Sequence, residues 1–186
     1  MNTTIAPNST GFDHYQFLTV DDRRELNRID SLSELAEIAI KIMKRLPKKV
    51  DMISGPISTG PGNSLKERLR IFQLSIEKLA QDPDLTVFSQ IPFENNIHAF
   101  AQRWRRIRGS KRYCQPILDI FYQRIFKSGC VGRLHFMPNY KLSVGAQWEH
   151  DIAPSFGIGQ VYLPGDFIDD IVERVQQEME FRPFSV

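Results

Sequence analysis

The sequence predicts an α/β fold: a flavodoxin- or Rossmann-like sheet of about four to five mainly parallel strands with helices on both faces. Short apolar runs that are typical of buried strands alternate with helical patterns of ten or more residues, as they do in βαβ units. Right-handed crossovers between parallel strands would then place helices on both faces of the sheet. A length of 186 residues fits one such domain with an extension.

The extension is predicted at the N-terminus. Residues 1–48 should form a loose arm followed by a helix, and the α/β domain should occupy residues 49–186. The beginning of the chain is rich in Asn, Thr, Ser and Gly. Apolar residues then recur at helical spacing over 24–46, and Pro47 ends the pattern, so one helix is expected there.

The first half of the domain is predicted to contain two strands with a helix between them. Residues 50–53 form a short apolar strand that a Ser-Gly-Pro turn ends. Asn63 is the expected N-cap of a helix that runs to about residue 81 with a buried apolar stripe. A second strand is expected over 85–93, where Val, Ile and Phe are typical of a sheet interior.

The second half is predicted to add two strands and three helices. The segment 95–112 has an amphipathic beginning and a basic end and receives no assignment. The expected elements are a helix over 115–127, a strand over 131–137, a short helix opened by Ser143, a strand over 160–163 and a helix over 166–180.

Two loops have the position and the chemistry of a binding site. In open parallel sheets, ligands bind beyond the carboxyl ends of the strands where the strand order reverses. The loops that follow the first and third predicted strands are adjacent in the order 2-1-3-4. The candidate substrate- or phosphate-binding residues are Ser54, Gly55, Pro56, Ser58, Thr59, Gly60 and Asn63 in the first loop, and Ser143 and Gly145 in the second.

The helix that begins near Ser143 carries the most informative pattern. A hydroxyl and bare backbone amides at a helix start suit an anion, because the N–H groups there are unpaired and the dipole is positive. Glu149 follows in the first turns, where it can meet the same ligand. The alternative is an ordinary helix start with a Glu that compensates the dipole.

Several other chemistries find no support in the sequence. Residues 55–60 match the beginning of a phosphate-binding loop of NTPases, but Pro61 stands where the Lys should be. No His, Cys or Asp cluster has zinc spacing and no G-x-S-x-G motif is present, so we expect neither a metal, another cofactor nor a serine hydrolase triad. Cys114 and Cys130 are expected to be reduced thiols, and His135 a core residue.

Composition and charge favour a cytoplasmic protein. No apolar run approaches the ~20 residues that span a bilayer, and the polar N-terminus lacks the pattern of a secretory signal. The net charge of +2 does not indicate a nucleic-acid partner. The basic segment Arg103–Arg112 could bind a phosphate or a nucleic-acid backbone, but charge runs are usually solvated surface, so a nucleic-acid binder ranks last among the functions considered.

Together these motifs resemble the nucleoside 2-deoxyribosyltransferase-like superfamily, which includes the 2'-deoxynucleoside 5'-phosphate N-hydrolases. The likeness covers roughly residues 50–164. It is carried by Met52-Ile53-Ser54-Gly55-Pro56-Ile57-Ser58 with Gly60, Gly62 and Asn63, and later by Phe136-Met137-Pro138-Asn139-Tyr140, Ser143, Gly145-Ala146 and Glu149.

The resemblance implies two catalytic residues. Glu149 is similar to the nucleophilic Glu that attacks the anomeric carbon, expels the nucleobase and forms a glycosyl-enzyme ester. Asp119 resembles an acid in the preceding helix of the family. The implied function is an N-glycosidase or deoxyribosyltransferase that acts on a nucleotide or nucleoside, and the implied assembly is a possible homodimer, since this superfamily often completes its sites across one.

Ser143 indicates a preference for 5'-monophosphates. Transferases of the family that act on free nucleosides tend to have an Asp at this place, and an Asp would repel a phosphate to which a hydroxyl can donate. Neither loop supplies an Arg and only Lys141 is near, so backbone N–H groups and hydroxyls are expected to hold the phosphate.

Two departures from the family pattern keep a second function open. Met52 stands where the family often has a Tyr that orients the nucleophile, and Gly132 stands where it usually has an Asp. A catalytically silent nucleotide-binding or protein-interaction module of the same fold is therefore the alternative. The base, the sugar and the choice between hydrolysis and transfer are not determined by the sequence.

Overall fold

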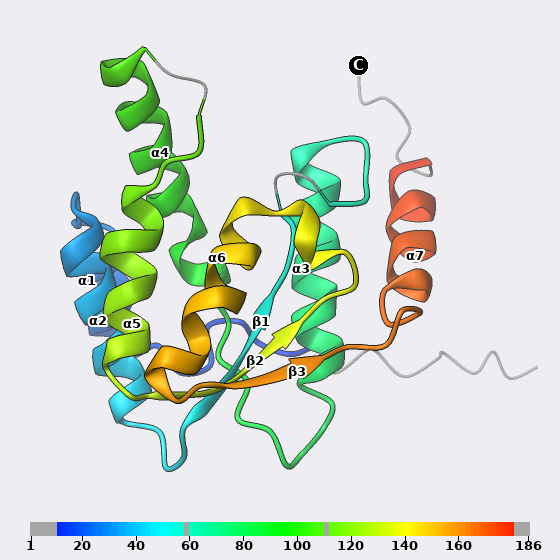
Figure 1. The fold of residues 1–186 in the computed structure, drawn as a ribbon, viewed down its shortest axis with the longest axis horizontal. Coiled ribbons are helices and arrows are strands. Elements are labelled where there is room, and N and C mark those ends of the chain that lie inside the picture. The colour runs from blue at the N-terminus through cyan, green and yellow to red at the C-terminus, as the bar shows by residue number, and fades with distance from the viewer. Residues whose placement is uncertain (1–10, 58–59, 110–111, 181–186) are drawn as a thin grey trace, which may run out of the picture.

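The computed structural model describes residues 11–57, 60–109 and 112–180, and its centre is a three-stranded sheet (Figure 1). The strands lie in the order β1-β2-β3, and both neighbouring pairs are parallel. The predicted α/β fold with a parallel sheet is confirmed, whereas the predicted number of four to five strands is wrong. The strands are β1 (Val50–Ser54), β2 (Val131–Phe136) and β3 (Gly159–Tyr162).

The missing strand is the one predicted over 85–93. Val87 forms only an isolated parallel bridge with Asp51, made by two backbone hydrogen bonds of 2.9 Å on the edge of β1 that faces away from β2. The chain then enters a 3₁₀ turn, Ile91–Phe93, because Pro92 has no N–H to donate to a strand ladder. The order 2-1-3-4 is kept, with a single bridge in place of the second strand.

The helix predicted over 24–46 is two helices, α1 (Val20–Leu26) and α2 (Leu32–Lys44). Ser31 separates them: its backbone is extended, and its Oγ accepts a hydrogen bond of 3.2 Å from the N–H of Glu34. A Ser in this role satisfies one of the unpaired N–H groups of a new helix start. The hydrophobic spacing continued through the break, which is why the pattern indicated one helix.

The remaining helices lie close to their predicted ranges. Ser64, and not Asn63, caps the helix after β1, since its Oγ accepts from the N–H of Glu67 at 3.2 Å. The segment 95–112, which received no assignment, is helical up to Arg108. None of the described helices is long and apolar enough to cross a membrane. The helices that follow β1 are α3 (Leu65–Leu79), α4 (Glu94–Arg108), a π-helical turn (Ile117–Tyr122) that leads into α5 (Gln123–Lys127), α6 (Val144–Ile152) and α7 (Asp169–Glu180).

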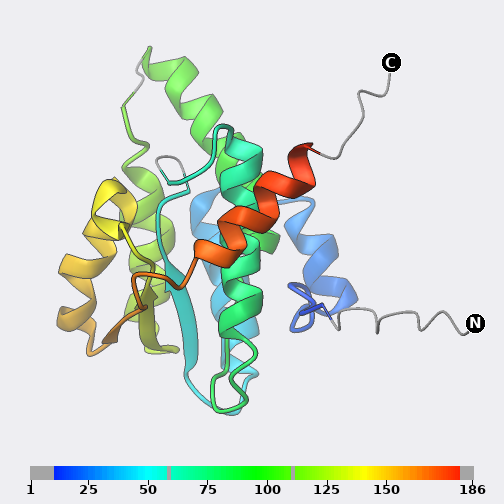
Figure 2. The same ribbon diagram turned by 90° about the vertical axis from the view of Figure 1, so that its right-hand side faces the viewer.

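Helices cover both faces of the sheet, as predicted (Figures 1 and 2). Neighbouring residues of a strand point to opposite faces. Met52 therefore packs into one hydrophobic cluster with α1, α2 and α5, while Ile53 packs into the other with α3 and α7. Figure 2 shows α7 lying across α3. The carboxyl ends of the strands are left between α3, α4 and α6.

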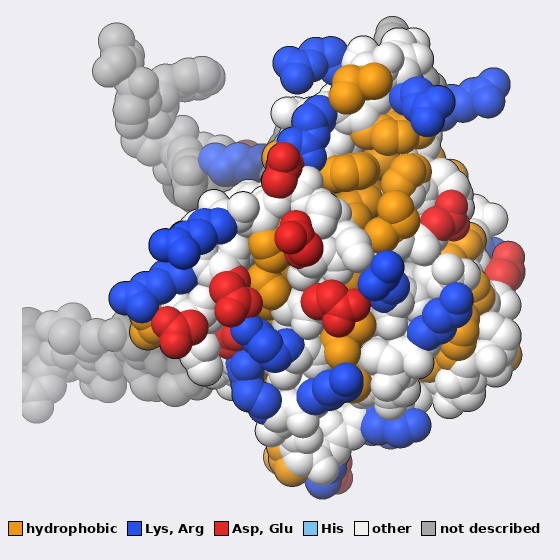
Figure 3. Space-filling model, turned by 90° about the vertical axis from the view of Figure 1, so that its left-hand side faces the viewer, with side chains coloured by type: hydrophobic (Ala, Val, Ile, Leu, Met, Phe, Trp, Pro, Cys, Tyr) orange, Lys and Arg blue, Asp and Glu red, His pale blue; other side chains and the backbone are white. Residues whose placement is uncertain are grey.

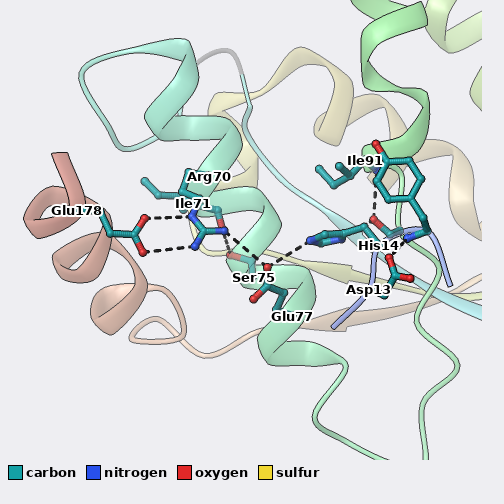
Figure 4. Close-up of polar contacts among 10 residues, drawn as sticks. Asp13, His14, Arg70, Ile71, Ser75, Glu77, Ile91 and Glu178 are labelled. Carbon is teal, nitrogen blue, oxygen red and sulfur yellow. Dashed lines mark hydrogen bonds and ion pairs between the residues drawn. The ribbon is translucent and has the colours of Figure 1, made fainter. Parts of the chain in front are cut away.

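A polar network ties the N-terminal segment and α7 to α3 (Figure 4). The ring of His14 lies 2.9 Å from Ser89 Oγ and 3.3 Å from Glu77 Oε1, and burial lowers its pKa although Glu77 opposes this. Arg70 Nε donates to Glu178 Oε2 at 3.1 Å. A hollow of about 600 Å³ between α3 and α7 is lined by this last pair, whose charges already compensate each other.

His135 is a core residue, as predicted, and belongs to a charged cluster inside the sheet. It is 4% exposed, and its Nε2 lies 2.9 Å from Oδ1 of the buried Asp51. Arg133 Nε donates to the same oxygen at 2.6 Å. Burial alone would raise the pKa of Asp51, but the bonds from Arg133 and His135 outweigh it and hold this pKa below its usual value. The cluster compensates charges within the fold.

Candidate active site

A cavity of about 420 Å³ opens beyond the carboxyl end of β1, between α3, α4, the π-helical turn and α6. Its volume lies in the range of small-molecule binding sites. Five of the predicted site residues line it, although they come from two loops and a helix far apart in the sequence. They are Ser54, Gly55, Ser143, Gly145 and Glu149.

Glu149 is buried in the wall of this cavity, with 8% of its surface exposed. The hydroxyl of Ser54 donates to its Oε2 at 2.5 Å. Burial raises the pKa of Glu149 to about 7; the bond from Ser54 opposes this rise, and the charge of Glu94 adds to it. Trp148 and Ile152 pack against the core from the other side of α6. Glu149 thus faces the end of β1 at Ser54.

The start of α6 is built as the sequence suggested. Ser143 is 7% exposed, and its Oγ accepts a hydrogen bond of 3.3 Å from the N–H of Ala146, so it is the N-cap of the helix. Gly145 lies against Tyr113: a Cβ at this position would stand 3.0 Å from the Tyr113 hydroxyl. Among the described residues no acceptor bonds the hydroxyl hydrogen of Ser143 or the N–H groups of Val144 and Gly145, so these donors remain available to an anion at the cavity.

In the described part of the loop after β1, Gly55 and Ile57 line the cavity. Pro56 is buried, and Pro56, Gly60 and Asn63 lie outside the lining. The backbone N–H of the exposed Asn63 donates to Glu67 Oε2 at 2.6 Å and helps to begin α3. Ser58 and Thr59 lie outside the described residues, so their predicted role stays a prediction.

Asp119 is not brought to the cavity. Its side chain is exposed, and its Oδ1 accepts a hydrogen bond of 3.0 Å from Gln115 Nε2, four residues earlier on the same helix face. Ile117 is part of the cavity wall. Because residues two positions apart on a helix point to nearly opposite sides, Asp119 faces away from Glu149's cavity. The geometry gives it no access to a ligand bound there.

The sequence did not indicate the contribution of α4. Most of its cavity-lining residues recur every three or four positions and so form one helical face, which Asn95 extends at its beginning: Glu94, Asn95, Ile97, His98, Ala101 and Arg105. Burial raises the pKa of Glu94 to about 7. The spacing is visible in the sequence. However, the segment before α4 was interpreted as a strand and the basic end of α4 as surface, so no face of this helix was assigned to a site.

Two tyrosines complete the wall opposite β1. Tyr113 and Tyr122 both line the cavity, and burial raises the pKa of each, with the charges of Glu149 and Glu94 acting in the same direction. Tyr122 is five residues after Ile117, and the π-helical turn places both on the cavity side. Such turns are frequent at functional sites. No sequence signal marks this one.

Gln90 closes the cavity near the end of β1. It is 4% exposed, and its Nε2 donates to the carbonyl oxygen of Ile53 at 2.7 Å. This bond fixes which way the amide points. Within the described ranges its Oε1 accepts no hydrogen bond. The side chain therefore supports the strand end that positions Ser54.

Replacing Gly55 by Ala is expected to destabilise the protein by about 1–3 kcal/mol. A Cβ at this position would stand 2.8 Å from Cγ and 2.9 Å from Cβ of the buried Met137, so neighbouring backbone must shift. Urea unfolding measures the change. Gly165→Ala is the matched control, because a Cβ there meets no atom within 4 Å, and its effect should stay within about 0.5 kcal/mol. Equal effects of the two variants would contradict the crowding.

The raised pKa of Glu149 predicts a pH-dependent cost in stability. A carboxyl whose pKa rises from 4.5 to about 7 on folding holds a proton that the unfolded chain has released, so the free energy of unfolding falls as pH rises between these values. Glu149→Gln removes this loss. The free energy of unfolding of the variant minus that of wild type should therefore rise by up to about 3 kcal/mol from pH 4.5 to pH 8. Urea unfolding at both pH values tests this, and an unchanged difference would contradict the raised pKa.

Comparison with known proteins leaves the cavity to be interpreted from its own residues. No family model, curated protein or solved structure matches the chain. Over the three described ranges, no group of three His, Cys, Asp or Glu side chains is placed to hold a metal ion. The lining residues supply carboxyl, hydroxyl, phenol and guanidinium groups.

Proposed function

We propose that the protein is an N-glycosidase or deoxyribosyltransferase that cleaves the N-glycosidic bond of a nucleotide or nucleoside, with a preference for 5'-monophosphates, on a flavodoxin-like sheet. One observation carries the proposal: Glu149 is a buried carboxyl in the wall of a cavity at the strand ends, hydrogen-bonded by Ser54. The resemblance of the sequence to deoxyribosyltransferase-like proteins assigns the nucleophile to the same residue.

The geometry suits a two-step displacement. Ser54 bonds Oε2 of Glu149, which leaves Oε1 as the attacking oxygen. In the first step this oxygen bonds to the anomeric carbon while the bond from that carbon to the base nitrogen breaks and its electron pair stays on the base. In the second step water or another base attacks the anomeric carbon, and the Glu149 carboxylate leaves with its electron pair.

Glu94 is the group best placed to move the proton. The departing base gains an electron pair and needs a proton, which a carboxyl with a pKa of about 7 can supply at neutral pH. In the second step the Glu94 carboxylate accepts a proton from the attacking water. Glu94, in place of Asp119, is thus the second catalytic carboxyl of the proposal, and it shares the cavity with Glu149.

The preference for a 5'-phosphate is supported by the start of α6. Ser143 and Gly145 line the cavity with a hydroxyl and with unpaired helix N–H groups, and such groups bind phosphate oxygens. A carboxylate in place of Ser143 would oppose this. The substrate would therefore lie with its phosphate toward α6 and its sugar against Glu149.

Release of free base tests the proposal. The purified protein is incubated with ribo- and 2'-deoxynucleosides and with their 5'-monophosphates, and free base is measured by chromatography. We expect base from at least one monophosphate, at a higher rate than from the matching nucleoside. Binding of nucleotides without base release from any of them would contradict the enzyme and support the catalytically silent module.

A further inference from the structure

One face of α4 runs along the cavity with an acid near its beginning and a base near its end. Glu94 lies in the first turn and Arg105 in the last. Eleven residues at 1.5 Å each separate them by about 16 Å along the axis. Arg105 is exposed and lines the cavity from the last turn of α4. The two ends of the cavity therefore differ in charge.

Among the described residues Arg105 has no hydrogen-bond or ion-pair partner, in contrast to Arg103. Arg103, two positions earlier, points away from the cavity and bonds the side chain and the carbonyl oxygen of Asp30. In the part of the chain that the structure describes, the guanidinium of Arg105 has no hydrogen bond or ion pair, and it is the one Lys or Arg side chain that lines this cavity. Lys141, the cation expected from the sequence, is exposed and lies outside the lining.

Tyr113 connects Arg105 to the start of α6. Its hydroxyl lies beside Gly145, where a Cβ would stand 3.0 Å away. Burial raises the pKa of Tyr113, and the positive charge of Arg105 opposes this rise. Arg105, Tyr113 and the first turn of α6 thus line the same cavity, and the Tyr113 hydroxyl lies beside Gly145.

We propose that Arg105 is the specificity-determining residue that binds the phosphate of the substrate. This deepens the proposed function and rests on it for the identity of the ligand. A guanidinium donates two parallel hydrogen bonds to phosphate oxygens, which hydroxyls and backbone N–H groups alone do not supply. The basic end of α4, where Lys and Arg side chains gather at the tip of the molecule in Figure 3, therefore belongs in part to the site.

The experiment compares Arg105→Gln with Arg106→Gln. Arg106 is the next residue on α4, is exposed, and does not line the cavity, so its variant makes the same charge change beside the site. Both changes are made in the Glu149→Gln background, which prevents turnover. Calorimetry then measures the affinities of the four 2'-deoxynucleoside 5'-monophosphates and of the matching nucleosides.

Arg105→Gln should lower the affinity for the monophosphate that binds best by about ten- to hundred-fold, which is the effect of losing a hydrogen bond between charged groups. The affinity for the matching nucleoside should change by less than about two-fold. Arg106→Gln should leave both affinities unchanged, and Arg105→Lys should restore part of the loss. An unchanged monophosphate-to-nucleoside ratio in Arg105→Gln, an equal loss in Arg106→Gln, or no binding of any monophosphate would overturn the inference. Phosphate-dependent binding that Arg105→Gln removes and Arg106→Gln keeps, together with a wild type that releases no base, would support Arg105 while refuting the enzyme.

Discussion

Glu149→Gln should lower the rate of base release by at least about a thousand-fold, because the variant loses the nucleophile of the covalent step. An amide of the same size has no charged oxygen to bond to the anomeric carbon, while its carbonyl oxygen still accepts the hydrogen bond from Ser54. The fold and the cavity should therefore stay intact. Initial rates at a saturating monophosphate concentration measure the effect, and circular dichroism checks the fold.

Asp119→Asn is the matched control for this loss. Asp119 is the other carboxyl that the sequence marked as catalytic, and its side chain is exposed outside the cavity. The substitution again exchanges a carboxylate for an amide, yet the rate should stay within about two-fold of wild type. A folded Glu149→Gln protein that keeps its activity, or an Asp119→Asn protein that loses it, would place the nucleophile elsewhere.

Glu94→Gln should lower the rate by about a hundred- to ten-thousand-fold for substrates whose base must be protonated as it leaves. For 7-methylguanine nucleotides the loss should be far smaller, because the base already carries a positive charge and departs as a neutral molecule. Rates of both substrates with wild type and variant give the two losses. Equal losses for the two substrates would show that Glu94 does not supply the proton.

The pH dependence separates Glu94 from a purely structural residue. Glu149 must be ionised and Glu94 protonated, and both pKa values lie at about 7. The rate should therefore rise with pH as Glu149 ionises and fall as Glu94 does, which gives a narrow bell centred near pH 7. In Glu94→Gln the falling limb should disappear while the rising limb remains. A profile that keeps both limbs would assign the second pKa to another group.

The sequence predicted the part of the site that depends on local chain order. An apolar strand followed by Ser54 and Gly55, and another followed by Ser143 and Glu149, point to the same edge of a parallel sheet wherever the strands are adjacent. Their convergence in one cavity follows from that topology. The interval of six residues between Ser143 and Glu149 then fixes the carboxyl one and a half turns into α6.

The part that was missed depends on backbone details that local patterns do not carry. The β-type residues around Val87 indicated a strand, but Pro92 and the single bridge to Asp51 end it before a ladder forms. The orientation of α4 depends on that turn. Arg105 therefore looked like one member of a charged surface run, since which of several adjacent arginines meets a cavity is decided by about 100° of helix rotation per residue.

The π-helical turn holds one residue more between Ile117 and Tyr122 than a regular helix needs to place both on one face. In an α-helix, residues five apart point about 140° away from each other, so Ile117 and Tyr122 could not share a wall. The wider turn places both on the wall of the cavity. Deleting a single residue between them would let a regular helix form in which they stand four positions apart and still share a face. A change of length by one residue in this segment therefore keeps both side chains on one face, while every chemical group on α4 and α6 stays the same.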